Sequence, residues 1–193
     1  MNVHNNYIYY IFFIIYSIEY KVMFKDISKF NNIDDYLPII TAILIVDMAI
    51  MFLSFTNIIQ SKFLRIWYKK FQLSAILADI SLIFLVFIFV RAIYYYIFDK
   101  FSIINFILLI VAVQIIHDIL FYIMISIIPR GTNQIIDLLK DYANEISYGA
   151  IIADSIMVIT IGLIASFLAN FDTNTNIIIL AVFIYLLQYI LYI

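Results

Sequence analysis

Long apolar runs alternate with short polar segments along most of the chain. A helix needs roughly 20 residues to cross a hydrocarbon layer about 30 Å thick, and five runs are long enough. They cover approximately residues 38–58, 73–97, 102–128, 148–169 and 176–193. The pattern therefore predicts an all-α fold, a polytopic bundle of transmembrane helices formed by 38–193.

The segment 7–18 is apolar and aromatic but would reach only about 18 Å as a helix. Glu19 and Lys21 follow it closely, and no basic stretch precedes it as in a signal peptide. Either a short sixth span or an interfacial helix agrees with this pattern. We expect 1–37 to hold this hydrophobic or interfacial segment and a polar linker.

Two polar connectors have the periodicity of amphipathic helices. In 62–71 the basic and apolar residues take opposite faces, the basic face holding Lys62, Arg65 and Lys69. In 134–147 charged and apolar residues also alternate with helical spacing. Because the spans alternate in direction, the connectors 59–72 and 129–147 and the C-terminus share one side. The excess of lysine and arginine in the connectors predicts that this side is cytoplasmic.

Composition supports a lipid environment and excludes several kinds of chemistry. The chain is 66% hydrophobic, against about 45–50% in soluble domains, and its mean hydropathy is +1.09. A bundle this apolar has the lipid bilayer as its main partner. Cysteine is absent and only two histidines occur, so thiolate and polyhistidine metal sites are excluded. We predict no cofactor, no nucleic-acid partner and no enzymatic activity, because no phosphate loop or protease motif occurs.

Each of the first four spans carries one aspartate: Asp47, Asp79, Asp118 and Asp154. An acidic side chain at the centre of a spanning helix costs about 2.5–3.5 kcal/mol, so these residues should face one another or water. In the third span, helical spacing places Gln114, His117 and Asp118 on one face. These six residues form the predicted intramembrane polar cluster.

Small residues mark one face of the fourth span, where a neighbouring helix could approach closely. They are Gly149, Ala153, Gly162, Ala165 and Ala169. We expect this span to be the centre of packing and to hold Asp154 beside Asp118. The uncharged fifth span should be peripheral.

Two functions fit this cluster. Four carboxyls and one histidine cannot all be charged together in an apolar bundle, so at least one carboxyl should be neutral. Neutral groups could form a polar network in a protein with a structural or assembly role, which contacts itself or other membrane proteins. Alternatively, the groups could relay protons or small cations in a channel or transporter.

An internal similarity relates the two halves. Ala75-Ile76-Leu77-Ala78-Asp79 begins the second span, and Ala150-Ile151-Ile152-Ala153-Asp154 begins the fourth. Each string follows an amphipathic connector. This pattern agrees with a duplicated unit, and also with convergence in an isoleucine-rich chain.

A longer set of motifs extends over the region from Gln114 to Met157. It comprises His117-Asp118-x-x-Phe121, Pro129-Arg130-Gly131-x-Asn133, Asp137-x-x-Lys140-x-Tyr142-Ala143-x-Glu145 and Ala150-Ile151-x-x-Asp154-Ser155-x-Met157. The set resembles a group of uncharacterised multi-pass membrane proteins encoded by large DNA viruses of protists. The resemblance implies a viral protein in a host or virion membrane, and no activity. An organelle-encoded or protist subunit of a membrane complex is the competing origin.

Overall fold

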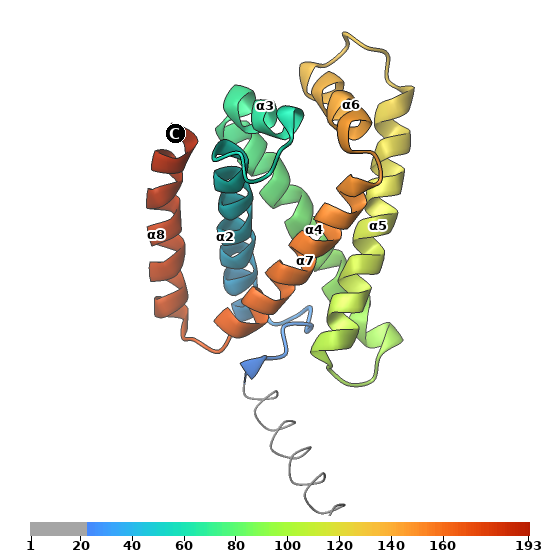
Figure 1. Cartoon of the computed structure of the whole chain (residues 1–193). Helices are drawn as coiled ribbons and strands as arrows, with labels where there is room; N and C mark the ends of the chain where they lie inside the picture. The colour runs from blue at the N-terminus through green and yellow to red at the C-terminus, as the bar shows by residue number, and fades with distance from the viewer. Residues whose placement is uncertain (1–22) are drawn as a thin grey trace, which may run out of the picture.

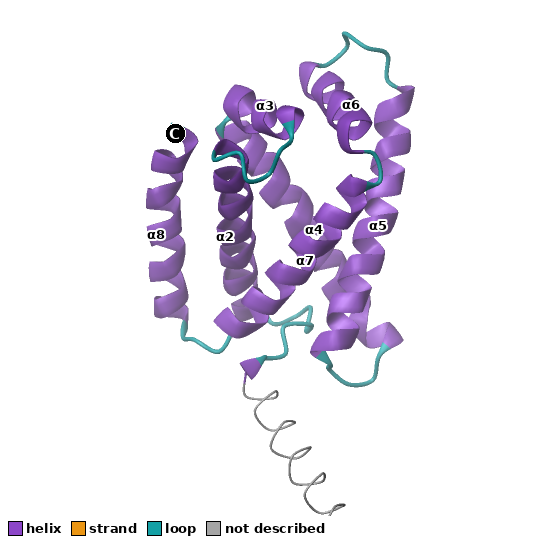
Figure 2. Ribbon diagram, viewed as in Figure 1, coloured by secondary structure: helices purple, strands orange, loops and turns teal. Residues whose placement is uncertain are grey.

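The computed structural model describes residues 23–193, and this part of the chain is helical without strands (Figures 1 and 2). Five helices are long and apolar enough to cross a membrane, which confirms the predicted transmembrane bundle. The segment 7–18 lies outside the described residues. The elements are η1 (Ile33–Asp35), α2 (Tyr36–Phe55), α3 (Lys62–Phe71), α4 (Leu73–Ile97), α5 (Ile103–Ile127), α6 (Gln134–Ile146), α7 (Gly149–Leu168) and α8 (Thr173–Leu191).

Local capping chemistry explains where several helices begin. The side chains of Ser61, Asn133 and Asp172 accept backbone N–H groups in the first turns of α3, α6 and α8. These bonds satisfy donors that a helix leaves unpaired at its N-terminus. The α2 helix begins two residues before Pro38, which fits in a first turn because its missing N–H has no helical partner there.

The helix α2, and not α7, is the most buried span. The prediction placed the fourth span at the centre, and α7 does pack against both α2 and α5 while crossing the bundle obliquely (Figure 1). However, α2 is contacted by α3, α4, α7 and α8, so it is enclosed on more sides. The last span, α8, packs mainly on α2 and is the least buried, as expected for a peripheral helix.

The small residues of α7 are used in only one half of the helix. Ala165 and Ala169 are buried, and a methyl group at Gly162 would lie 2.5 Å from Cδ1 of Ile107 on α5. A side chain at this position would therefore have to displace the end of the Ile107 side chain. At the other end of α7, Gly149 is half-buried and Ala153 is exposed.

Both connector helices lie at the same end of the bundle as the C-terminus, and they contact each other (Figure 1). We call this the connector end. The opposite end holds the segment 23–35 and the α4–α5 and α7–α8 loops (Figure 1).

The internal similarity extends to the backbone at the two connector-to-span junctions. Gln72 joins α3 to α4 with φ 46° and ψ −121°, and Ser147 joins α6 to α7 with φ 49° and ψ −127°. A positive φ is uncommon for residues other than glycine, so two nearly equal values are informative. Asp79 and Asp154 follow their junctions at the same distance along the chain.

Candidate functional site

The four intramembrane aspartates divide into two groups at the connector end. In the first group, α3 supplies a partner to each of two carboxyls. The Tyr68 hydroxyl donates to Oδ1 of Asp47 at 2.8 Å, and the Trp67 indole Nε1 donates to Oδ2 of Asp79 at 2.9 Å. The amphipathic periodicity of 62–71 predicted neither bond.

Tyr68 is a permanent donor in this arrangement. Its side chain is buried, and burial together with the neighbouring carboxyls of Asp47 and Asp79 raises the pKa of Tyr68 well above its ordinary value. The phenol therefore keeps its proton at any physiological pH. Through Trp67 and Tyr68, α3 is held on α2 and α4.

The second group lies on α5 and α7. Nε2 of Gln114 donates to Oδ1 of Asp118 at 2.7 Å, and Nδ1 of His117 lies 3.2 Å from the same oxygen. The His117 ring stacks on Phe121 with centroids 5.7 Å apart. The predicted helical face on α5 thus forms a local network. It is partly open, because the side chains of His117 and Asp118 are 30% and 13% exposed.

Asp154, the member of the second group on α7, lies near the α5 residues without a hydrogen bond to them. Electrostatic interactions link Asp154 to Asp118, Asp79 and His117. Within residues 23–193, no hydrogen bond joins Asp154 directly to Asp118. The two aspartates expected to lie side by side are therefore near each other across α5 and α7, without a hydrogen bond between them.

Tyr142 of α6 is, after Tyr68 of α3, a second tyrosine of a connector helix that lies near the intramembrane aspartates. Burial, and then the carboxyls of Asp154 and Asp79, raise the pKa of Tyr142. Tyr142 precedes Asp154 by the same number of residues as Trp67 precedes Asp79. In each half of the chain, an aromatic residue of the connector thus interacts with the aspartate of the span that follows, by a hydrogen bond from Trp67 and electrostatically for Tyr142.

Glu145 joins the two connectors to each other. Its carboxylate accepts the Ser61 hydroxyl at 2.6 Å and the backbone N–H groups of Lys62 and Phe63 at 2.8 and 3.1 Å. Partial burial alone would raise the pKa of Glu145, but these hydrogen bonds outweigh it and hold the pKa below its ordinary value. The C-terminal turn of α6 is thereby tied to the N-terminus of α3, where a negative charge is also favoured by the helix dipole.

An apolar layer separates this polar region from the opposite end of the bundle. The core there is built from aliphatic and aromatic residues that include Ile39, Ile43, Ile83, Phe87, Phe106, Ile110 and Ile161. The four aspartate-bearing spans contain no ionisable residue over 37–46, 80–90, 103–113 and 155–168. Each of these stretches is at least about 14 Å long as a helix.

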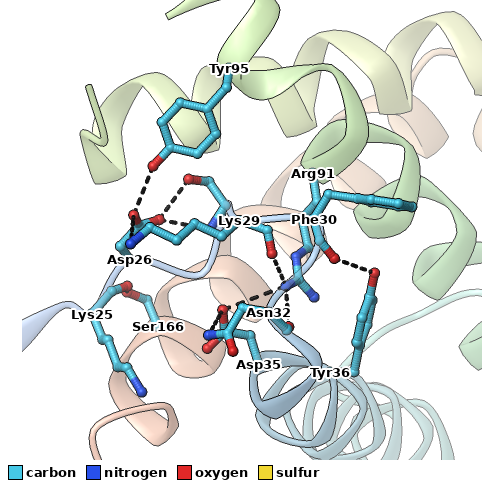
Figure 3. A network of polar contacts seen from close by, with 11 residues as sticks. Lys25, Asp26, Lys29, Phe30, Asn32, Asp35, Tyr36, Arg91, Tyr95 and Ser166 are labelled. Atoms are coloured by element: carbon cyan, nitrogen blue, oxygen red, sulfur yellow. Dashed lines mark hydrogen bonds and ion pairs between the residues drawn. The ribbon is translucent and has the colours of Figure 1, made fainter. Parts of the chain in front are cut away.

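A second polar network lies at the opposite end, around Arg91 (Figure 3). The Arg91 and Asp35 side chains are 0% and 1% exposed, and Nη2 of Arg91 lies 3.5 Å from Oδ2 of Asp35. The same nitrogen donates to the carbonyl oxygens of Asn32, at 2.7 Å, and Lys29. The guanidinium also lies 4.0 Å from the ring centroid of Tyr36.

These contacts fix the segment 23–35 against α4 and α7 (Figure 3). The backbone N–H of Lys25 donates to the Ser166 carbonyl at 3.2 Å, and the Ser166 hydroxyl donates to the Lys25 carbonyl at 2.6 Å. Tyr95 donates to Asp26 at 2.8 Å. The described part of the predicted linker is therefore packed into the bundle. Sequence analysis missed the partners of Arg91, because they include backbone carbonyls of a segment without regular structure.

Residues 23–193 contain no group of three or more histidine, cysteine or acidic side chains arranged to hold a metal ion. No protein-family model, curated protein or solved structure matches the chain. The resemblance to membrane proteins of large DNA viruses accordingly stays a prediction.

Proposed function

We propose that this integral membrane protein has a structural or assembly role, and that its buried polar residues lock non-spanning segments onto a rigid bundle. The observation that carries the proposal is the bonding of Asp47 and Asp79 to Tyr68 and Trp67. Interhelical hydrogen bonds of this kind fix the register of packed helices in a membrane. They hold the connector α3 in place and leave each of these two carboxyls with a donor.

Both ends of the bundle follow the same design. At the connector end, Glu145 ties α6 to α3. At the opposite end, Arg91 ties the segment 23–35 to α4. Short segments are thus fastened by polar side chains, of which Arg91 is buried and Glu145 is exposed, and the outer surface of the spans remains apolar for lipid or for a neighbouring membrane protein.

The apolar layer argues against the alternative, in which protons or small cations pass along the aspartates. A relay needs titratable groups or ordered water across the whole hydrocarbon layer. Here the acids occupy only the connector half, and the four spans offer no ionisable side chain over the stretches beyond it.

Purified protein in liposomes tests this proposal against transport. We expect proteoliposomes to hold an imposed pH gradient as long as empty liposomes do. Asp118→Asn and Asp154→Asn serve as matched variants, because asparagine keeps the size of aspartate but cannot titrate. A wild-type proton leak that both variants abolish would overturn the structural role and establish transport.

The sidedness of the protein is part of the same proposal. We infer that the connector end faces the cytoplasm or an equivalent interior, on the basis of its lysine and arginine excess. The native chain has no cysteine, so single cysteines at the exposed positions Gln60 and Thr132 give a clean background. Both should react with an impermeant thiol reagent only when the interior side is accessible. Reaction from the exterior side would contradict the assignment.

A further inference from the structure

The connector helix α3 has a strongly basic outer surface. It carries four lysine and arginine residues and no acidic residue. Lys62, Lys69 and Lys70 are exposed, and we call them the lysine face. Arg65 differs from them, because it is held by the side chain of Asn57 and the carbonyl of Ser54.

The orientation of the lysine face is fixed by the buried side of the same helix. Trp67 and Tyr68 point into the bundle, where they are 6% and 2% exposed, and bond to Asp79 and Asp47. Rotating α3 about its axis would break both hydrogen bonds. The lysines are therefore presented outward by a rigid support.

Within residues 23–193 no ion pair closes the lysine face, although Lys62 interacts electrostatically with Glu145, whose carboxylate already accepts the Ser61 hydroxyl and two backbone N–H groups. None of its three ammonium groups forms an ion pair with a carboxylate there. The Nζ atoms instead lie 5.2–5.4 Å from the ring centroids of Phe71, Phe63 and Phe55. Cations beside aromatic rings suit the boundary between headgroups and acyl chains, where both an anion and an apolar surface are at hand.

We propose that the lysine face binds anionic phospholipid headgroups in the leaflet at the connector end. The α3 helix lies across the ends of α2 and α4 at the connector end (Figure 1). In a bilayer crossed by these two spans, their ends lie at the level of the lipid headgroups. Each lysine near an anionic surface strengthens binding by about fivefold at low salt, so the three together give a measurable lipid preference.

The chain contains its own reporter for this site. Trp67 is the only tryptophan of the 193 residues, and it lies on α3 between the lysines. We expect brominated lipids bound beside this helix to quench its fluorescence. Quenching by brominated phosphatidylglycerol, compared with brominated phosphatidylcholine in mixed bilayers, therefore measures the local preference for an anionic headgroup.

Wild-type protein should prefer phosphatidylglycerol, and the preference should fall at least fivefold in the Lys62→Gln, Lys69→Gln, Lys70→Gln triple variant. The corresponding arginine variants should retain it. A control with the same change of charge replaces Lys25, Lys29 and Lys100 at the opposite end by glutamine and should behave as wild type.

Two results would each overturn the proposal. One is equal quenching of the wild-type protein by the two lipids, and the other is a preference that the triple glutamine variant retains. Far-UV circular dichroism and the emission maximum of Trp67 check that the variants fold. If the glutamine variant does not fold, a salt titration of the wild-type protein tests the proposal. The Debye length at 0.5 M salt is only about 4 Å, so electrostatic binding to headgroups should weaken there. A lipid preference that does not change at 0.5 M salt would overturn the proposal.

Discussion

Replacing Arg91 tests the network at the end opposite the connectors. Arg91→Met keeps the apolar stem of the side chain and removes the guanidinium. Asp35, whose side chain is 1% exposed, then loses its ion-pair partner. The Asn32 carbonyl also loses the Arg91 donor, and the Lys29 carbonyl keeps only the backbone N–H of Asn32 at 3.1 Å. Breaking a buried ion pair from one side typically costs about 3–5 kcal/mol. We expect a value near the lower limit, because Asn32 still donates to Asp35 at 2.8 Å and exposed residues nearby admit water.

Asp35→Asn is the matched control for this change. It leaves the bonds from Arg91 to the two carbonyls and its contact with Tyr36, so we expect a loss of about 1–2 kcal/mol. The double variant no longer buries an unpaired carboxylate. Its cost should therefore be smaller than the sum of the two single costs by at least about 1 kcal/mol.

The free energy of unfolding can be measured in mixed micelles of sodium dodecyl sulfate and a non-ionic detergent, followed by far-UV circular dichroism. Fluorescence of Trp67 reports the connector end independently. A loss below about 0.5 kcal/mol in Arg91→Met, or strictly additive single and double variants, would show that the network does not stabilise the fold. If the ellipticity of the variant falls at a lower detergent concentration than its Trp67 fluorescence changes, the Arg91 end unfolds before the connector end.

Three further predictions concern the bundle and its connector end. Gly162→Leu should lower the melting temperature strongly, because even a methyl group at this position would lie 2.5 Å from Ile107 Cδ1. Leu186→Ala, on the exposed face of α8, should change the melting temperature little. Similar melting temperatures for the two variants would contradict the packing of α5 on α7 at Gly162. The pKa of Glu145 is held below its ordinary value of 4.5, so its contribution to stability is present above pH 4.5 and is lost as the pH falls through the lowered pKa. A Glu145→Gln variant should lack this pH dependence of the melting temperature between pH 3 and 6. The same pH dependence in the wild type and the variant would refute the role of Glu145 in joining α6 to α3. Asp118→Asn should be tolerated in detergent unfolding, but Asp118→Leu should cost about 1–3 kcal/mol because Gln114 loses its acceptor, and equal losses would contradict a hydrogen-bonded role.

The spans and connectors follow from the order of apolar and polar residues alone. A run of about 20 apolar residues can satisfy its backbone hydrogen bonds in lipid only as a helix, so run length decides the number and position of the spans. The same holds for α3 and α6, whose apolar residues recur with helical spacing beneath a charged face. The capping residues Ser61 and Asn133 also act on their immediate neighbours in the chain.

The partners of the buried charges were decided by the tertiary structure. A buried aspartate in a spanning helix needs a hydrogen-bond donor, so a partner for Asp47 could be expected. That donor, Tyr68, comes from a helix that the sequence places at the membrane surface. Likewise Glu145 accepts a hydrogen bond from Ser61, 84 residues earlier in the chain, and Arg91 bonds to backbone carbonyls, which every residue possesses. Periodicity describes which face of a helix is apolar, and it carries no information about which other helix will meet that face. That choice is made when all the helices pack together, because each buried polar atom must then find its partner among the few groups within about 3 Å.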